Sequence, residues 1–282
     1  MLSSPTRYER PATLSEATAL LAQGGLRMLA GGTDVYAARV GLAPPAALLD
    51  LSAVQGLRGI TQLDGGWWFG ATTTWADVLR APLPPQFNAL KQAAGEVGGV
   101  QVQNMGTLGG NLCNASPAAD GTPVWLALDA QVELHSQRGT RRMGVAQFVT
   151  GPRHVALARD ELLSGIWVPQ GSARVRSHFT KLGARRYLVI SIAMVAVAVD
   201  VDGDGRIATI AVAVGACSAV AQRLVELEYR LRGRPVSALL AAQVQARDLS
   251  CLNPLDDVRA SAAYRRDAVR NLVQRALMEL AA

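Results

Sequence analysis

Cysteine is scarce in this chain of 282 residues. There are three cysteines, Cys113, Cys217 and Cys251, and no two of them form a C-x-x-C pair. An odd number at such wide spacing does not suit a disulfide framework, and an iron–sulfur cluster held by this chain alone would need four ligands. We therefore expect a reducing compartment, with neither structural disulfides nor a resident cluster.

Aromatic residues and long apolar runs are also few. Aromatic side chains make up 5% of the chain, and the longest apolar run, Leu188 to Val199, is too short to cross a bilayer. Residues 1–10 lack the apolar stretch of a signal peptide. Hydrophobic residues still make up 50% of the chain, which is ample for a globular core. These features predict a cytoplasmic protein with no membrane span.

The positive charge of the chain is spread out. The formal net charge is +6, but no block of five or more Lys or Arg residues occurs. Nucleic-acid binding would need a concentrated basic patch beside aromatic side chains, so no nucleic-acid partner is expected. The excess reflects either an Arg-rich composition or a surface complementary to an acidic partner subunit. His135, His154 and His178 lack metal-ligand spacing, and no Ser-His-Asp or Cys-His set is apparent, so we predict no metal site and no catalytic side chain.

The order of apolar segments and turn signals predicts an α+β protein. A capping box opens a helix over residues 13–23, and strands at 27–30 and 46–51 indicate a small parallel sheet. Hairpins are expected over residues 59–70 and 192–217, and a new domain begins near Gly171. Further helices are expected over residues 84–97, 121–128 (with Asp120 as N-cap), 219–232, 237–247 and 261–280, the last with Ala263 on its buried stripe.

Two double-glycine segments are the most informative feature of the sequence. The first is Ala30-Gly31-Gly32-Thr33-Asp34, and the second runs from Asn104 through Gly109-Gly110-Asn111 to Asp120. Glycine permits close approach of the main chain and positive φ, so bare N–H groups beside Thr and Asn side chains suit a pyrophosphate. Neither segment has the spacing of a Rossmann G-x-G-x-x-G turn or a P-loop lysine. The pair predicts a dinucleotide cofactor that carries the chemistry.

The same segments resemble the FAD-binding signature of the molybdenum hydroxylases, the relatives of xanthine dehydrogenase and carbon monoxide dehydrogenase. The chain is similar to their separate medium subunit, and the likeness continues through residues 181–193 and 257–266. It implies an FAD-binding unit of the vanillyl-alcohol-oxidase type over residues 1–170, with subdomains of about 1–55 and 56–170. A small α/β C-terminal domain over residues 171–282 would follow.

The resemblance also implies roles for particular residues. Residues 30–34 would wrap the pyrophosphate, and the second segment would hold the phosphates and approach the flavin. Asp120 would accept a hydrogen bond from a sugar hydroxyl, and Lys181 would contact FAD. Tyr187 would stand over the isoalloxazine or be an ordinary aromatic of the core or edge. The implied FAD-binding residues are Ala30, Gly31, Gly32, Thr33, Asp34, Thr107, Gly109, Gly110, Asn111, Asn114, Ser116, Asp120, Lys181 and Tyr187.

A medium subunit of this family implies partner chains. A large subunit with a molybdopterin cofactor would hydroxylate the substrate, and a small subunit with two [2Fe–2S] clusters would pass electrons to FAD in a heterotrimer. NAD, oxygen or quinone would be the external acceptor. A xanthine dehydrogenase-like subunit with NAD is the first expectation, beside FAD subunits of aldehyde, carbon monoxide or N-heterocycle hydroxylases. A stand-alone flavoprotein oxidase and a non-catalytic flavin module remain as alternatives from other classes.

Overall fold

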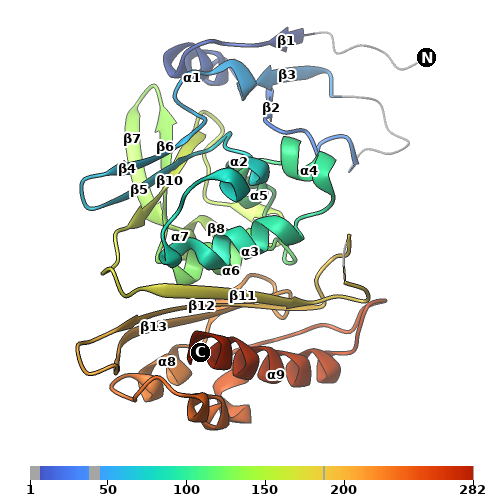
Figure 1. Cartoon of the computed structure of the whole chain (residues 1–282). Coiled ribbons are helices and arrows are strands. Elements are labelled where there is room, and N and C mark those ends of the chain that lie inside the picture. Colours follow the sequence, from blue (N-terminus) through green and yellow to red (C-terminus); the bar gives the residue numbers. More distant parts are fainter. Residues whose placement is uncertain (1–6, 38–44, 187, 282) are drawn as a thin grey trace.

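Three larger sheets follow one another down the molecule (Figure 1). The computed structural model describes residues 7–37, 45–186 and 188–281. A three-stranded sheet lies at the N-terminal end, a five-stranded sheet with helices lies in the middle, and a four-stranded sheet with a long C-terminal helix lies at the other end. The fold is α+β, as the sequence predicts.

The first unit is a small parallel sheet covered by one helix. Strands β1 (Arg7–Glu9), β3 (Ala47–Asp50) and β2 (Arg27–Leu29) pair in that order, and both pairings are parallel. Helix α1 (Leu14–Ala22) begins at the predicted capping box. The Thr13 side chain accepts the backbone N–H of Glu16, and the Glu16 side chain accepts the backbone N–H of Thr13. The 3₁₀ turn η2 (Leu51–Ala53) follows β3 directly.

The middle unit is an antiparallel sheet packed against short helices. Its strand order is β4 (Ile60–Leu63), β5 (Gly66–Gly70), β10 (Leu162–Pro169), β6 (Gln131–Ser136) and β7 (Gly139–Gly144). The helical segments are α2 (Trp75–Arg80), η3 (Pro85–Phe87), α3 (Asn88–Glu96), α4 (Val100–Met105), α5 (Leu108–Asn114), α6 (Gly121–Ala127) and α7 (Val145–Phe148), and a small hairpin joins β8 (Val149–Gly151) to β9 (His154–Val155). Phe69 packs edge-to-face on Phe87 and Trp125, with ring centroids 5.2 and 5.4 Å away, and centres the core.

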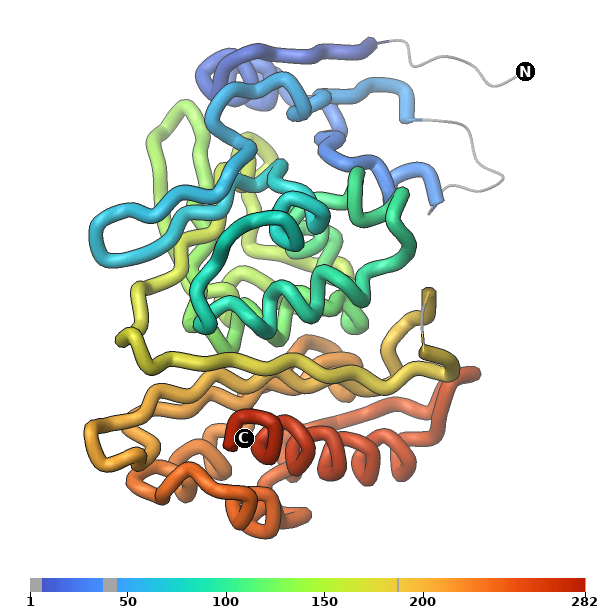
Figure 2. The backbone as a smooth tube through the Cα atoms, in the orientation of Figure 1, coloured from blue at the N-terminus to red at the C-terminus, as the bar shows by residue number. Residues whose placement is uncertain are grey.

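The third unit has a sheet that is buried on both faces. Strands β11 (Arg176–Leu182), β12 (Ala193–Val201), β13 (Ile207–Gly215) and β14 (Gln222–Arg223) pair antiparallel in that order. Side chains of β12 alternate between the faces, so its valines join the core under helix α9 (Ala262–Ala281) while Met194, Ala196 and Ala198 join the core of the middle unit. Strand β11 therefore runs between α3 and α9 (Figure 2).

Two helices of this unit differ from the sequence prediction: one is shorter, and the other is replaced by two 3₁₀ segments. Over 219–232 the helix α8 spans only Val225–Leu231, because Arg223 is held at the sheet by Glu228 and by Asp129 of the middle unit. Over 237–247 the chain forms two 3₁₀ segments, η4 (Ala238–Gln243) and η5 (Ala246–Leu249). In α9 the predicted buried position Ala263 is exposed, and Ala268 is buried instead.

A buried arginine fastens α9 to the sheet. The Arg265 guanidinium donates to the carbonyls of Ile192 and Ala216 and to the Asp257 carboxylate at 2.7 Å. The backbone N–H of Arg259 and the Arg265 side chain lower the pKa of Asp257 to about 2. The carboxylate is therefore charged in the fold at pH values where it would be protonated in the unfolded chain.

We expect an acid-dependent loss of stability from this contact. A depressed pKa means that the stabilisation is present above pH 4 and is lost as the pH falls toward 2. The Asp257 side chain is 36% exposed, so solvent screens the contact, and we expect the lost free energy of unfolding to be about 1 kcal/mol. Urea melts of wild type and Asp257→Asn at pH 7, 4 and 2.5 measure it: the difference between the two proteins should shrink at the lowest pH. A constant difference across that range would contradict the assignment.

Candidate functional site

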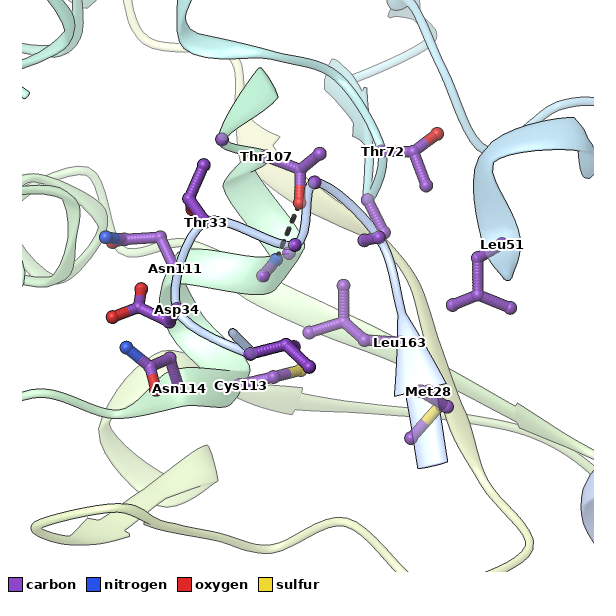
Figure 3. A pocket seen from close by; sticks show the side chains of 18 of the residues that line it. Met28, Thr33, Asp34, Leu51, Thr72, Thr107, Asn111, Cys113, Asn114 and Leu163 are labelled. Carbon is purple, nitrogen blue, oxygen red and sulfur yellow. Dashed lines mark hydrogen bonds between the residues drawn. The ribbon is translucent and has the colours of Figure 1, made fainter. Parts of the chain in front are cut away.

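A cavity of about 410 Å³ lies where the first unit meets the middle unit (Figure 3). The loop after β2 closes one side and helix α5 another, while Met28, Leu51 and Leu163 supply apolar wall. The cavity volume lies in the range of small-molecule and cofactor sites. Both glycine segments of the sequence reach it, so the structure brings them together across more than seventy residues of chain.

The loop after β2 presents bare main chain to the cavity. Ala30, Gly31, Gly32, Thr33 and Asp34 all line it. Among the described residues, no protein acceptor pairs with the backbone N–H groups of residues 31–34. These four donors sit side by side in one turn, an arrangement that suits an anionic group with several oxygens.

Two features of the glycines hold this loop in shape. Gly32 has φ +70°, a left-handed conformation that side chains rarely adopt. Gly31 instead lies against the second segment: a Cβ added there would come within 1.8 Å of the Met105 carbonyl oxygen. The loop can therefore seat on the end of α4 only if residue 31 has no side chain.

The second glycine segment differs from the expectation. Gly109 and Gly110 lie in the first turn of α5 with helical backbone, so positive φ is not their role. The amides there already have protein acceptors: Leu108 donates to Thr73 O and Gly109 to Ala71 O, both at 2.9 Å, and Gly110 donates to the N-cap hydroxyl of Thr107 at 3.0 Å (Figure 3). Gly109 is required for packing, because a Cβ would meet Ala71 at 2.8 Å.

Polar side chains gather on the loop side of the cavity. Asp34, Asn111 and Asn114 lie near one another in Figure 3, with Thr33 beside them. The Asn111 Oδ1 atom is buried and has no hydrogen-bond partner among the described residues, whereas Asn114 Oδ1 accepts from Arg153. An unpartnered buried amide oxygen is costly unless a ligand supplies its donor. The Oδ1 atom lies beside Gly121 of α6, where an added Cβ would come within 2.8 Å of it, so it does not face the loop at residues 30–34.

Three predicted residues lie away from this cavity. Ser116 accepts the backbone N–H of Ala118 within its own turn. Asp120 is buried; its Oδ2 accepts from Lys181 Nζ at 2.8 Å and its Oδ1 from Ser191 Oγ at 2.6 Å. Asp120 holds the N-cap position of α6, but its carboxylate makes no capping hydrogen bond, which corrects the sequence expectation. Burial raises the pKa of Asp120, and Lys181 and Ser191 oppose that rise. Tyr187 lies outside the described residues.

Some lining residues were not foreseen from the sequence. Ala71 and Thr72 form the turn after β5 that receives the amides of α5, and Cys113 faces the cavity from α5. Burial raises the pKa of the Cys113 thiol to about 12, so the thiol stays protonated and unreactive. The Ala71-Thr72-Thr73-Thr74 run after a strand was a signal for such a turn, but not for its contact with a segment more than thirty residues away.

The cavity contains no acid–base or metal constellation. Within the described residues no three His, Cys, Asp or Glu side chains come together to hold a metal ion. No described helix is long and apolar enough to span a membrane. The free backbone donors and apolar walls suit an extended, partly anionic ligand.

Comparison with known proteins identifies the group to which this cavity belongs. Residues 4–171 match the family model described as the FAD binding domain in molybdopterin dehydrogenase, and residues 178–280 match the CO dehydrogenase flavoprotein C-terminal domain. The fold and the cavity thus define an FAD-binding oxidoreductase subunit. The chain belongs to the FAD-binding medium subunits of the molybdenum hydroxylase family.

Individual relatives extend over nearly the whole chain. The chain is 31% identical over 281 residues to the nicotine 6-hydroxylase medium subunit of Paenarthrobacter nicotinovorans, covering 98% of this chain and 97% of that one. It is 30% identical over 285 residues to a xanthine dehydrogenase FAD-binding subunit of Escherichia coli O157:H7, covering 98% and 96%. The solved structure of a Cu,Mo-CO dehydrogenase superposes with a TM-score of 0.90 at 25% identity, covering 98% of both chains. That of quinoline 2-oxidoreductase from Pseudomonas putida 86 gives 0.89 at 25%, covering 100% and 98%.

Proposed function

We propose that this chain holds FAD as the electron-transfer subunit of a heteromeric molybdenum hydroxylase. A xanthine dehydrogenase-like complex with NAD as acceptor is the first candidate, and aldehyde, carbon monoxide or N-heterocycle hydroxylases share the same subunit plan. The single observation behind the proposal is the turn at residues 31–34, which lines the cavity and whose four backbone N–H groups have no acceptor among the described residues. Bound FAD would supply the redox chemistry, receiving electrons from partner [2Fe–2S] clusters and passing them to the acceptor.

The residues of the cavity fit such a cofactor. The amides of residues 31–34 would bind the pyrophosphate, and the Asn111 side chain, which also lines the cavity, would contact the ligand. Thr107, Gly109 and Gly110 would act mainly by fixing α5 against residues 71–73, because their amides are already bonded within the protein. Apolar walls from both units would cover the flat rings.

The other proposed contacts have an indirect role in this arrangement. Asp120 and Lys181 join α6 of the middle unit to β11 of the third unit, so they would help to hold the two units together. Ser116 shapes the turn before α6. We propose that residues 1–170 form the FAD-binding domain and residues 171–282 a C-terminal domain, with the cofactor bound chiefly by the former.

Purified chain is expected to be yellow and to release FAD rather than FMN on denaturation. Two separate walls of the cavity reach the ligand, and a mononucleotide would leave one of them without a contact. Mass analysis of the released cofactor checks this. Bound FMN, or no flavin affinity at all, would contradict the site.

The electron relay needs a separate test with partner chains. The purified chain should not hydroxylate any substrate alone, whereas flavin absorbance should bleach anaerobically when substrate is added to a complex with the large and small subunits. Complexes that lack the iron–sulfur subunit are the control. Bleaching that is independent of the partners would favour a stand-alone flavoprotein.

A further inference from the structure

One residue, Arg153, fastens the turn of the hairpin β8–β9 to the C-terminal end of α5. Its backbone N–H donates to the Ala115 carbonyl at 2.8 Å. Its guanidinium donates to the Asn114 carbonyl at 3.3 Å and also to the Asn114 Oδ1 atom. Asn114 and, from the hairpin, Val155 both line the cavity between the first and middle units. Arg153 therefore joins two parts of the cavity wall that are distant in the chain.

Both residues of the backbone contact have a left-handed conformation. The φ angle is +45° at Ala115, which ends α5, and +63° at Arg153. Neither is glycine, although glycine adopts positive φ at the least cost. Backbone strain of this kind persists only where the surrounding contacts enforce it, and it is concentrated at ligand sites. Glycine at position 153 would keep the backbone contact without the strain, so that contact alone does not account for an arginine there.

The guanidinium of Arg153 determines which way the Asn114 amide faces. A guanidinium has donors and no acceptor, so the amide turns its oxygen toward Arg153 and its NH₂ group away from it. In Figure 3 the nitrogen end of Asn114 is turned toward Asp34, on the side of the cavity where the turn at residues 31–34 lies. The Asn114 Nδ2 atom has no acceptor among the described residues. Its two N–H donors are therefore left for a ligand.

We infer that Arg153 is a positioning residue of the cofactor site, which turns the Asn114 amide so that Nδ2 donates to a phosphate oxygen of the ligand. This inference rests on the proposed function, because it takes the cavity to hold FAD. The free backbone amides of residues 31–34 make the same side of the cavity a site for an anion. A cation bonded to the amide oxygen polarises the amide and strengthens its N–H donors. Arg153 is not among the lining residues of the cavity, so it acts through Asn114.

Arg153→Gly separates the guanidinium from the backbone contact. Glycine keeps the N–H that donates to Ala115 and adopts positive φ freely, so the melting temperature of the full chain without FAD should not fall. FAD should bind about threefold to tenfold more weakly, the loss expected for one hydrogen bond. Thermal melts and flavin titration of the full chain measure the two effects. The matched control is Arg159→Ala, at an exposed arginine without a partner among the described residues, which should bind FAD as wild type does.

A double-variant cycle tests whether Arg153 acts through Asn114. Asn114→Ala should weaken FAD binding, and adding Arg153→Gly should weaken it no further. Equal losses from Arg153→Gly in both backgrounds, or wild-type affinity in Arg153→Gly, would overturn the inference. A melting temperature of Arg153→Gly that falls together with its affinity would also overturn it, because Arg153 would then only hold the fold. All of these results leave the proposed function standing, whereas a wild-type chain that binds no FAD would overturn the proposed function and this inference with it.

Discussion

Gly31→Ala is expected to lose most FAD binding, with an increase of the dissociation constant of about one to two orders of magnitude. The added methyl group would lie 1.8 Å from the Met105 carbonyl oxygen and 2.7 Å from its carbonyl carbon. Both are main-chain atoms, which cannot rotate away as a side chain can. The turn at residues 30–34 must therefore shift, and its four free amides move away from the phosphates that they would bind.

A second glycine provides the control for this prediction. Gly95 lies within α3, where an added Cβ would meet only Leu79 Cδ2 at an ordinary 3.9 Å. Gly95→Ala should keep wild-type FAD affinity and gain stability of about 0.5–1 kcal/mol from helix propensity. Flavin titration and thermal melts of both variants measure the two effects separately. Wild-type FAD affinity in Gly31→Ala would show that the turn does not bind the cofactor.

Lys181→Met is expected to destabilise the fold by about 3–5 kcal/mol. The substitution leaves the Asp120 carboxylate buried without its cation, with only the Ser191 hydroxyl as a partner. Asp120→Asn with Lys181→Met removes both charges and should regain most of that loss. Urea melts of the single and double variants give the coupling energy.

The pH dependence of Lys181→Met carries a further expectation. Burial already raises the pKa of Asp120 in the wild type, and loss of Lys181 raises it more. A raised pKa favours the fold at low pH and disfavours it once the carboxyl ionises, so the deficit should be smallest in acid and grow as the pH rises through the raised pKa. A deficit that is independent of pH, or equal in the single and double variants, would show that Asp120 and Lys181 are not coupled.

Local signals in the sequence predicted much of the fold and the wall of the cavity. The capping box at Thr13, the Asp-Gly turn of the hairpin β4–β5 and the valine alternation of β12 are short-range features that the tertiary structure reinforces. The helix expected over 219–232 forms only over Val225–Leu231, because Gln222 and Arg223 pair with β13 as strand β14 and Arg223 also contacts Asp129, contacts that no local pattern encodes. Long-range pairing overrode propensity there.

The site shows the same division. The structure brings parts of both glycine segments, residues 30–34 and 106–114, to one cavity, but the glycine pattern did not indicate how each part is used. The amides of α5 are bonded to residues 71–73, and the Asp120 carboxylate is bonded to Lys181 and Ser191. Sequence identifies which donors and acceptors exist. Only the folded arrangement shows which of them are already satisfied and which remain for a ligand.

The alternation along β12 has a consequence for how this protein can be divided. Its small side chains, Ala196 and Ala198 with Met194, belong to the same apolar core as Phe69 and Trp125, which lie far upstream in the chain. A cut near residue 171 would therefore open the interior of the upstream half and expose it to water. The segments that match the two family models share one hydrophobic core, so the boundary between them in sequence does not separate two independent cores.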